Sequence, residues 1–272
     1  MAKKARSKSV PKLQVIRVGS ITEAINKAMD WIKPSDQEDF WWYRGVNDSK
    51  LELLPGAYWR KGYDEKRSLL DFVQEGRAYA HIGELDDWRT YYLAQHHGVP
   101  TRLLDWTESF LSALFFAIDG WNGKTVPCVW ILRPGLLNKL SINWRGIVTP
   151  EQNKELEMWL PTKIRTGPKS IAHKEGGSYD SRLPIAIYPR KENARIVAQQ
   201  GTFTVHGTEP LKLNEWIYQR HRNPKSILCR IDLTGLTREI ALAQLSALGA
   251  RRHTVYPDID SYVGYLKQKH GW

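Results

Sequence analysis

An arginine set among aromatic residues is the first group in the chain whose chemistry suits a charged ligand. Arg44 follows Tyr43 and precedes Gly45, directly after two tryptophans. A guanidinium suits phosphate through paired hydrogen bonds, and aromatic rings suit a nucleobase or a nicotinamide by stacking. Glycine lets a ligand approach the backbone closely. The segment 41–45 therefore favours a nucleotide site.

A second polar cluster lies directly before an apolar helical run. Residues 91–119 place His97, Arg102 and Asp105 ahead of a segment rich in Leu, Phe and Ala. Polar groups that dense beside a core segment either pair in a buried network or line a pocket. Arg102 and Asp105 can pair with each other or with Arg44, so a purely structural ion pair stays an alternative. We expect both clusters to contribute to one cleft.

Several common types of catalytic and nucleotide-binding site are excluded, because their sequence motifs are absent from the chain. The chain has no G-x-x-x-x-G-K-[ST], G-x-G-x-x-G, H-E-x-x-H or G-x-S-x-G motif. Its two cysteines, Cys128 and Cys229, each lie inside an apolar run, so we expect buried free thiols in strands. His96 and His97 are neighbours that point in different directions on a helix, so they do not easily ligate one metal together. We predict no metal site.

The net charge of +11 indicates a polyanionic partner. Basic residues gather in 3–12, 163–195 and 220–230. Such a surface attracts nucleic acid, although the same charge also serves solubility alone. No apolar run approaches the ~20 residues of a membrane span, and the basic N-terminus lacks the apolar core of a secretory signal. We expect a cytoplasmic protein with no membrane partner.

The order of apolar and polar residues predicts a flexible basic tail over 1–15 and a single domain over 16–272. Helices and strands mix without regular βαβ alternation, which favours the α+β class with a split or antiparallel central sheet and flanking helices. Expected helices cover 20–33, 65–82, 86–97, a segment capped by Thr107 that ends near Gly120, a segment opened by Thr149-Pro150, 237–248 and 258–269; expected strands cover 40–46, 102–104, 126–133, 183–188, 201–206 and 226–231, with a long loop at 164–182.

The same residues carry a resemblance to the FRG domain family, which is named for an aromatic-Arg-Gly motif. Here that motif is Tyr43-Arg44-Gly45, and the long second block of the family resembles His97–Thr107. A third block is similar to Ala198–Thr204, and the closing block is similar to Tyr256–Asp260. The resemblance therefore implies an FRG-type domain over most of 16–272.

A further likeness, to ADP-ribosyltransferases, rests on the order of the parts. Those enzymes hold NAD with a strand that carries His-Gly or an Arg, and Arg44-Gly45 is similar to it. Their next strand leads directly into a helix, as 100–104 leads into 107–118. Their late strand starts at a catalytic Glu, where this chain has Gln199-Gln200. Gln carries no charge, so it does not stabilise an oxocarbenium-like cation as a carboxylate does.

The likeness implies an ADP-ribosyltransferase-like sheet and an enzyme of the glycosyltransferase class, with NAD as its substrate and cleavage between nicotinamide and ribose. Asp105, Asp258 or Asp260 would then supply the missing acid, unless the reaction is lost. The likeness assigns catalysis to Arg44, Asp105, His97 and Gln200, which would orient the ribose, and NAD binding to Tyr43, Arg44, Gly45, Thr101, Arg102, Trp106, Thr107 and Gln199.

The resemblance also implies partners. Enzymes of this kind act as toxins in phage defence or toxin–antitoxin systems, which implies nucleic acid as the acceptor, RNA favoured over DNA, and an antitoxin or chaperone as a protein partner. Two alternatives stay open. One is a non-catalytic module that binds a nucleotide or nucleic acid, and the other is a hydrolase of a phosphorylated or glycosidic substrate that uses Asp105 with His97.

Overall fold

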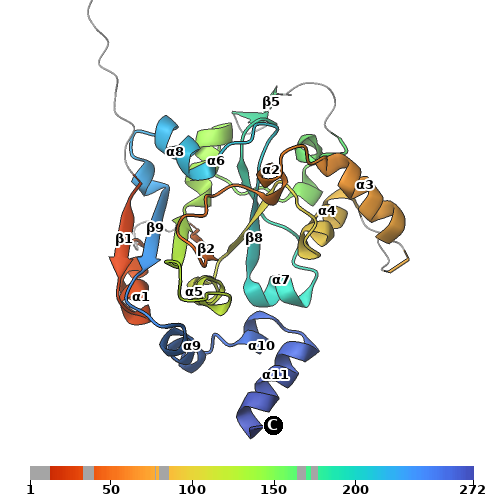
Figure 1. Cartoon of the computed structure of the whole chain (residues 1–272). Helices are drawn as coiled ribbons and strands as arrows, with labels where there is room; N and C mark the ends of the chain where they lie inside the picture. Colours follow the sequence, from red (N-terminus) through yellow and green to blue (C-terminus); the bar gives the residue numbers. More distant parts are fainter. Residues whose placement is uncertain (1–12, 33–39, 77, 80–85, 164–169, 173–176) are drawn as a thin grey trace, which may run out of the picture.

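The computed structural model describes residues 13–32, 40–76, 78–79, 86–163, 170–172 and 177–272. Its centre is an open seven-stranded sheet in the order β1-β9-β4-β2-β3-β8-β7, beside a separate pair of β5 and β6 (Figure 1). The strands are β1 (Val15–Val18), β2 (Trp42–Val46), β3 (Leu103–Thr107), β4 (Cys128–Leu132), β5 (Ser170–Ala172), β6 (Ser178–Asp180), β7 (Ile185–Ile187), β8 (Gly201–Val205) and β9 (Leu228–Leu233).

Helices cover both faces of this sheet. The α-helices are α1 (Ile21–Met29), α2 (Gly56–Trp59), α3 (Glu65–Gly76), α4 (Asp87–His96), α5 (Phe110–Asp119), α6 (Pro134–Ile142), α7 (Ala194–Gln199), α8 (Leu213–Arg220), α9 (Arg238–Ala247), α10 (Arg252–Val255) and α11 (Ile259–His270). Short 3₁₀ helices are η2 (Pro150–Gln152), η3 (Lys154–Trp159) and η4 (Pro224–Ser226). Within the described ranges, none of the helices combines the length and the apolar character that crossing a membrane requires.

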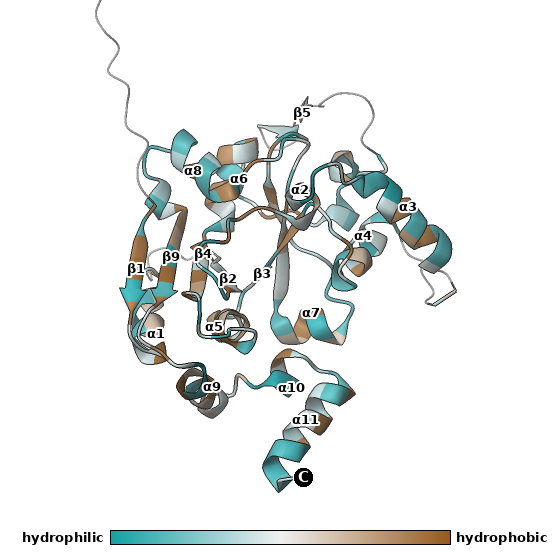
Figure 2. Ribbon diagram, viewed as in Figure 1, coloured by the Kyte–Doolittle hydropathy of each residue, from teal (hydrophilic) through white to brown (hydrophobic). Residues whose placement is uncertain are grey.

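Alternate residues of the central strands face two different helix layers, as the period of two along a strand requires. Tyr43 and Ile131 belong to the core cluster that includes buried residues of α1, α5 and α9. Trp42 and Leu132 belong to the opposite cluster, with buried residues of α6 and α8. Hydrophobic stretches accordingly lie along β1, β9 and β4, whereas α3 and α11 are mainly hydrophilic (Figure 2).

In the described part of the chain, the pairing between β2 and β3 is reduced to a single pair of residues in register, Tyr43 and Thr107. By contrast, β2 pairs with β4 over Trp42–Val46, and β3 pairs with β8 over Leu103–Thr107. All neighbours in the sheet are antiparallel except β1 and β9. The predicted α+β class with a split, largely antiparallel sheet and flanking helices is confirmed.

Helix α5 packs against β2 at backbone contact. A Cβ atom on Gly45 would lie 1.7 Å from the carbonyl oxygen of Ala113 and 2.7 Å from the amide nitrogen of Ala117. Only glycine leaves room for the helix at this point. The space that the missing side chain of Gly45 leaves is therefore occupied by α5, and Gly45 itself also lines the pocket described below.

The expected capping of the segments near 107 and 150 is wrong. The strand expected at 102–104 extends to Thr107, so Thr107 ends β3 and does not cap a helix. The N-cap of α5 is Ser109, whose Oγ accepts from the Ser112 amide at 3.2 Å. Thr149-Pro150 opens only a 3₁₀ turn, without a side-chain cap. In both cases the helix start was predicted at a threonine, Thr107 or Thr149, that does not cap an α-helix.

The predicted tail and loop are only partly described. Residues 1–12 lie outside the described residues, and β1 begins at Val15, the last residue of the predicted tail, opposite Arg230. Of the predicted loop at 164–182, residues 164–169 and 173–176 are outside the description, and β5 and β6 pair within the rest. The ends of the expected helices at 33 and 80–82 also fall on residues that are not described.

Both cysteines are buried and free, as predicted. Cys128 lies on β4 and Cys229 on its neighbour β9. Burial raises the pKa of Cys128 to about 12, so its thiol stays protonated and unreactive at neutral pH.

Candidate functional site

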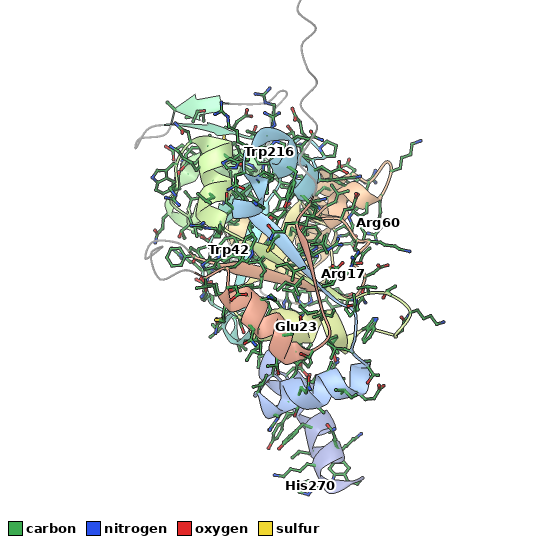
Figure 3. The ribbon with its side chains drawn as sticks, turned by 90° about the vertical axis from the view of Figure 1, so that its left-hand side faces the viewer. Arg17, Glu23, Trp42, Arg60, Trp216 and His270 are labelled. Atoms are coloured by element: carbon green, nitrogen blue, oxygen red, sulfur yellow. The ribbon has the colours of Figure 1, made fainter. Side chains whose placement is uncertain are left out.

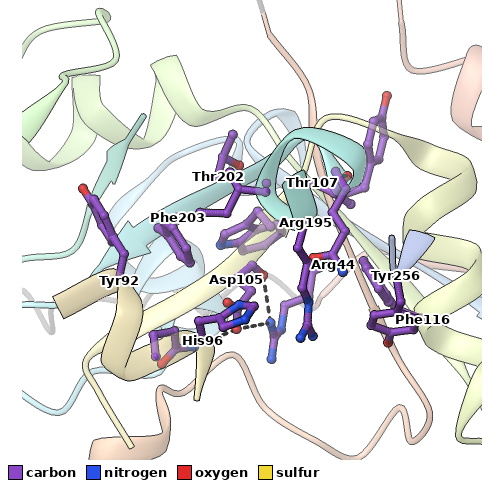
Figure 4. Close-up of a pocket in the computed structure, with 17 residues that line it drawn as sticks. Arg44, Tyr92, His96, Asp105, Thr107, Phe116, Arg195, Thr202, Phe203 and Tyr256 are labelled. Carbon is purple, nitrogen blue, oxygen red and sulfur yellow. Dashed lines mark hydrogen bonds and ion pairs between the residues drawn. The ribbon is translucent and has the colours of Figure 1, made fainter. Parts of the chain in front are cut away.

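A pocket of about 290 Å³ lies where β2 and β3 diverge, and Figure 4 shows its lining side chains. Its walls come from β2, β3, β8, α4, α5, α7 and the segment after α10. Its aromatic residues are Tyr43, Tyr92, Trp106, Phe116, Phe203 and Tyr256, and its polar residues are Arg44, Gln95, His96, Asp105, Thr107, Arg195, Gln199 and Thr202. The segments near 44, 105 and 199 that the sequence analysis expected to meet therefore line one pocket.

Arg44 bridges the two diverging strands. Its Nη1 donates to the backbone carbonyl of Asp105 at 2.8 Å and lies 3.7 Å from the carboxylate of the same residue. The guanidinium thus stands where a continuous ladder between β2 and β3 would otherwise run. Burial lowers the pKa of Arg44 and the nearby carboxylate raises it, but an arginine remains a cation in either case. The side chain is 22% exposed, and a guanidinium has more donors than these two contacts use.

Gln95 holds the carboxylate of Asp105 in place, and the sequence analysis did not single it out. Its Nε2 donates to Asp105 Oδ2 at 2.8 Å, while its Oε1 accepts from the Thr101 hydroxyl at 2.6 Å. Thr101 Oγ1 also accepts from the Leu103 amide at 3.1 Å. This chain of bonds fixes the direction of the amide. The 57% exposed side chain of Asp105 is therefore oriented while much of it stays open to solvent or a ligand.

The aromatic walls are held in place by a hydrogen bond from Trp106 and by stacking of neighbouring rings. Trp106 Nε1 donates to Thr204 Oγ1 at 3.1 Å, which fixes the indole plane. Tyr92 and Phe203 are stacked, with centroids 5.2 Å apart and planes only 7° from parallel. The pKa of Tyr43 is raised by burial to about 12, so its hydroxyl is neutral. The rings form a rigid apolar surface of the kind that binds a flat heterocycle.

A second arginine and a buried hydroxyl add to the polar groups of the pocket. Arg195, from α7, lies with its guanidinium carbon 5.0 Å from the centroid of the Tyr256 ring. Like Arg44, it brings a positive charge to the lining (Figure 4). Thr202 Oγ1 is buried without a hydrogen-bond partner in the described residues. A buried polar atom without a partner costs free energy, which a ligand supplying that bond would recover.

His96 faces the pocket as a neutral base. Its pKa is lowered by partial burial first, and then by the positive charges of Arg195 and His97. An imidazole whose pKa lies below its usual range is uncharged at pH 7 and can accept a proton. Its neighbour His97 turns elsewhere, to a separate hollow beside Phe72 and Tyr63. The hydrolase alternative needs His97 at the same site as Asp105, and the two residues line different hollows.

The two glutamines at the end of α7 separate. Gln199 lines the pocket, and its Nε2 donates to the Val255 carbonyl at 3.1 Å. Thr107 also lines the pocket and ties β3 to α7, because its hydroxyl donates to the Gln199 carbonyl at 2.5 Å. Gln200 is the exposed C-cap of α7, with a left-handed backbone (φ 50°), and it is not part of the lining. The amide that faces the pocket is therefore Gln199, which corrects the role expected for Gln200.

Arg102 belongs to a buried network and not to the pocket. It is 4% exposed, and its Nε lies 2.7 Å from Glu65 Oε2. Its Nη2 donates to the Trp159 carbonyl at 2.5 Å, and its amide donates to Tyr91 Oη at 2.9 Å. Tyr91 in turn donates to Glu65. The expected NAD-binding role of Arg102 is thus replaced by a structural one, and buried Thr101 contributes only through Gln95.

Of the three acids considered for catalysis, one lies in the pocket. Asp105 is the only carboxylate among its lining residues within the described chain. Asp258 is the N-cap of α11 and accepts from the Ser261 amide at 2.7 Å and its hydroxyl at 3.1 Å. Asp260 lies exposed in the first turn of the same helix. In the ranges that the structure covers, no three His, Cys, Asp or Glu side chains gather as a metal site would require.

One region of the chain that contributes residues to this pocket matches a known family. Residues 39–125 match the model of the FRG domain. The chain contains an FRG domain. The match covers just under a third of the 272 residues and includes Arg44, Gln95 and Asp105. The lining residues from Arg195 to Tyr256 lie outside the matched FRG segment. No curated protein and no solved structure matches the chain.

Proposed function

We propose that this FRG-domain protein transfers ADP-ribose from NAD to a nucleic-acid acceptor, with RNA preferred to DNA. The observation that carries the proposal is a pocket with two arginines and several aromatic rings around one carboxylate. Arg44 and Arg195 suit the pyrophosphate, and Trp106 suits the nicotinamide ring. A volume of about 290 Å³ is small for a whole dinucleotide and suits its nicotinamide–ribose end.

The proposed step is a displacement at C1′ of the ribose. The bond from C1′ to the nicotinamide nitrogen breaks, and its electron pair leaves with the nicotinamide, which becomes neutral. A nucleophilic oxygen or nitrogen of the acceptor bonds to C1′ and gives its proton to His96, which passes it to solvent. Asp105 stabilises the positive charge that develops on the ribose, the role of the glutamate that this chain lacks. Gln199 hydrogen-bonds a ribose hydroxyl.

The charge of the chain supports an anionic acceptor. The excess of 40 basic over 29 acidic residues favours association with RNA or DNA and makes it salt-dependent. We propose that the protein acts in the cytoplasm as a toxin in phage defence or in a toxin–antitoxin pair. An antitoxin or a chaperone would then restrain it until it is needed.

The test is transfer of label from NAD radiolabelled on its adenylate phosphate. The protein is incubated with total RNA, DNA and protein in parallel, and nicotinamide release is measured. We expect label on RNA, with a loss of at least about 100-fold in Asp105→Asn, because the developing cation loses its counter-charge. Asp260→Asn is the matched control, since it removes an exposed carboxylate outside the pocket. Equal rates for the two variants would exclude Asp105 from the chemistry.

A non-catalytic nucleotide-binding module is the second candidate. It is favoured by Gln199-Gln200, which stands where transferases carry a charged residue. Calorimetric titration with NAD separates the two functions. Binding that is lost in Arg44→Ala, without nicotinamide release on any acceptor, would support the module and exclude the transferase.

A further inference from the structure

A second hollow, of about 300 Å³, adjoins the candidate pocket. The two share Arg44, Gln95 and Asp105, so these side chains form a partition with a hollow on each side. The far wall of the second hollow includes Trp59, the last residue of α2, and Arg60, the residue that follows this helix. A group in this hollow would reach Asp105 at the boundary with the ring-lined pocket, where His96 also lies.

Trp59 presents a large aromatic surface to solvent at this hollow. Its side chain is 57% exposed, although tryptophan is usually among the more buried residues. Its Nε1 donates to the Leu54 carbonyl at 2.7 Å, which holds the indole in one orientation. An exposed aromatic ring that is held in place is the platform on which unpaired nucleobases stack.

The cations beside Trp59 are free. Arg60 and Lys61 are both exposed, and within the described part of the chain neither makes an ion pair or a side-chain hydrogen bond. Some other surface arginines are paired, as Arg252 is with Asp119 at 2.8 Å and Arg182 with Asp180 at 2.6 Å. Arg60 projects from the body of the molecule in the side view (Figure 3). Unpaired cations next to an exposed ring match the alternation of phosphate and base along a strand.

We propose that this second hollow binds single-stranded nucleic acid and presents it to Asp105. A base stacks on Trp59, a neighbouring phosphate pairs with Arg60, and the following nucleotide reaches the partition formed by Arg44 and Asp105. The presentation to Asp105 rests on the proposed transferase function, whereas the binding itself does not. Duplexes are disfavoured, because a paired base has no free face for the indole.

The binding test uses fluorescent ten-nucleotide single strands of uridine and of deoxyuridine, and a matched RNA duplex. Trp59→Ala is expected to raise the Kd for single strands about tenfold, and Trp59→Phe to restore part of the affinity, because stacking is worth about 1–3 kcal/mol per base. Arg60→Gln is expected to raise the Kd several-fold and to reduce the salt slope by about 1. Comparison of the two single strands tells whether the sugar matters.

Matched controls remove an exposed ring and an exposed cation elsewhere: Trp272→Ala, on a 67% exposed side chain, and Arg17→Gln on the edge strand β1. If the control variants weaken binding as much as the Trp59 and Arg60 variants, the proposed subsite is wrong. A duplex bound as tightly as the single strand would also overturn it.

The transferase assay separates this proposal from the function on which it rests. In Trp59→Ala, the KM for RNA is expected to rise about tenfold while NAD binding by calorimetry is unchanged. Strand binding that depends on Trp59, with no transfer of label, would support the subsite and exclude the transferase. Transfer of label to protein alone, unaffected by Trp59→Ala, would exclude the subsite and retain the transferase with another acceptor.

Discussion

Two ion pairs near β3 use the same charged groups, a guanidinium and a carboxylate, in opposite ways. Arg102 is 4% exposed, lies 2.7 Å from Glu65, and has further bonds to backbone and tyrosine. Arg44 is 22% exposed and lies 3.7 Å from the carboxylate of Asp105. The first pair is buried and bonded to several partners, which is the state that a structural network requires. The second keeps spare donors and an open carboxylate, which is the state that a binding site requires.

The difference follows from where the sheet is continuous. The network of Arg102 lies where β3 begins its full ladder with β8, among the buried residues of a separate core cluster that includes Tyr91, Leu103 and Trp159. Arg44 lies beside the single rung that joins β2 to β3, so its guanidinium faces a gap. A residue next to such a gap can serve a ligand without loss of core packing.

The largest expected effect breaks the buried pair. Arg102→Ala should lower the free energy of unfolding by about 4 kcal/mol, because it leaves the Glu65 carboxylate buried and unpaired. Arg44→Ala should cost less than about 1 kcal/mol, since its pair is partly exposed. Urea denaturation of both variants measures this difference. Equal losses would show that the two pairs do not differ in kind.

Gly45→Ala tests whether the glycine beside Arg44 serves packing. It should destabilise the protein by about 3 kcal/mol, because the added methyl group meets the backbone of α5. Gly264→Ala, on the outer helix α11, is the control and should be neutral or slightly stabilising, since nothing lies within 4 Å of its added carbon. Thermal unfolding gives both values. An unchanged stability with lost NAD binding would instead support the ligand-approach interpretation.

His206 lies near both Arg102 and Arg44, so its pKa reports the positive charge of the two arginines together. Burial, followed by the charges of Arg102 and Arg44, lowers its pKa to about 3. The unfolded chain takes up the proton near pH 6.5 and the folded chain does not, so the stability contributed by the neutral ring is lost as pH falls from 6.5 towards 3. By pH 5 the loss should be about 2 kcal/mol. Urea midpoints against pH should be flatter in His206→Gln, and the exposed variant His270→Gln should keep the slope.

The smallest effect concerns the orientation of Asp105. Gln95→Leu should lower kcat for label transfer about tenfold with an unchanged KM for NAD, because the carboxylate loses the amide that directs it. Gln244→Leu, an exposed position on α9, serves as the control. Initial rates at several NAD concentrations give the two constants. A change in KM alone would show that Gln95 acts on binding and not on the carboxylate.

The fold and the convergence of the site were largely predictable. The antiparallel, mixed character followed from the period of two in segments such as 201–206 and the lack of βαβ alternation. The meeting of Arg44 and Asp105 was expected from their residue types and from the resemblance to FRG domains. Local sequence patterns sufficed to predict these features because each strand and each polar cluster is formed by residues that are consecutive or nearly consecutive in the chain.

The partners within the site could not be predicted, for two physical reasons. Arg102 found Glu65, 37 residues earlier, and Tyr256 reached the pocket from the far end of the chain, and no local pattern encodes such contacts. Gln199 and Gln200 diverge because a helix cap with positive φ turns the chain between them. Gln95 carried one usable signal: it precedes His96 in the last turn of α4, beside the second polar cluster.

The wall formed by Tyr256 has a practical consequence for the laboratory. Tyr256 lies in the chain between α10 and α11, and α10 is tied to the body through Arg252 and through the Val255 carbonyl. A purification tag or fluorescent fusion appended after Trp272 would be attached to α11, the helix that follows Tyr256 in the chain. A version tagged at this position should therefore be compared with an untagged one for nucleotide affinity before either is used in the assays above.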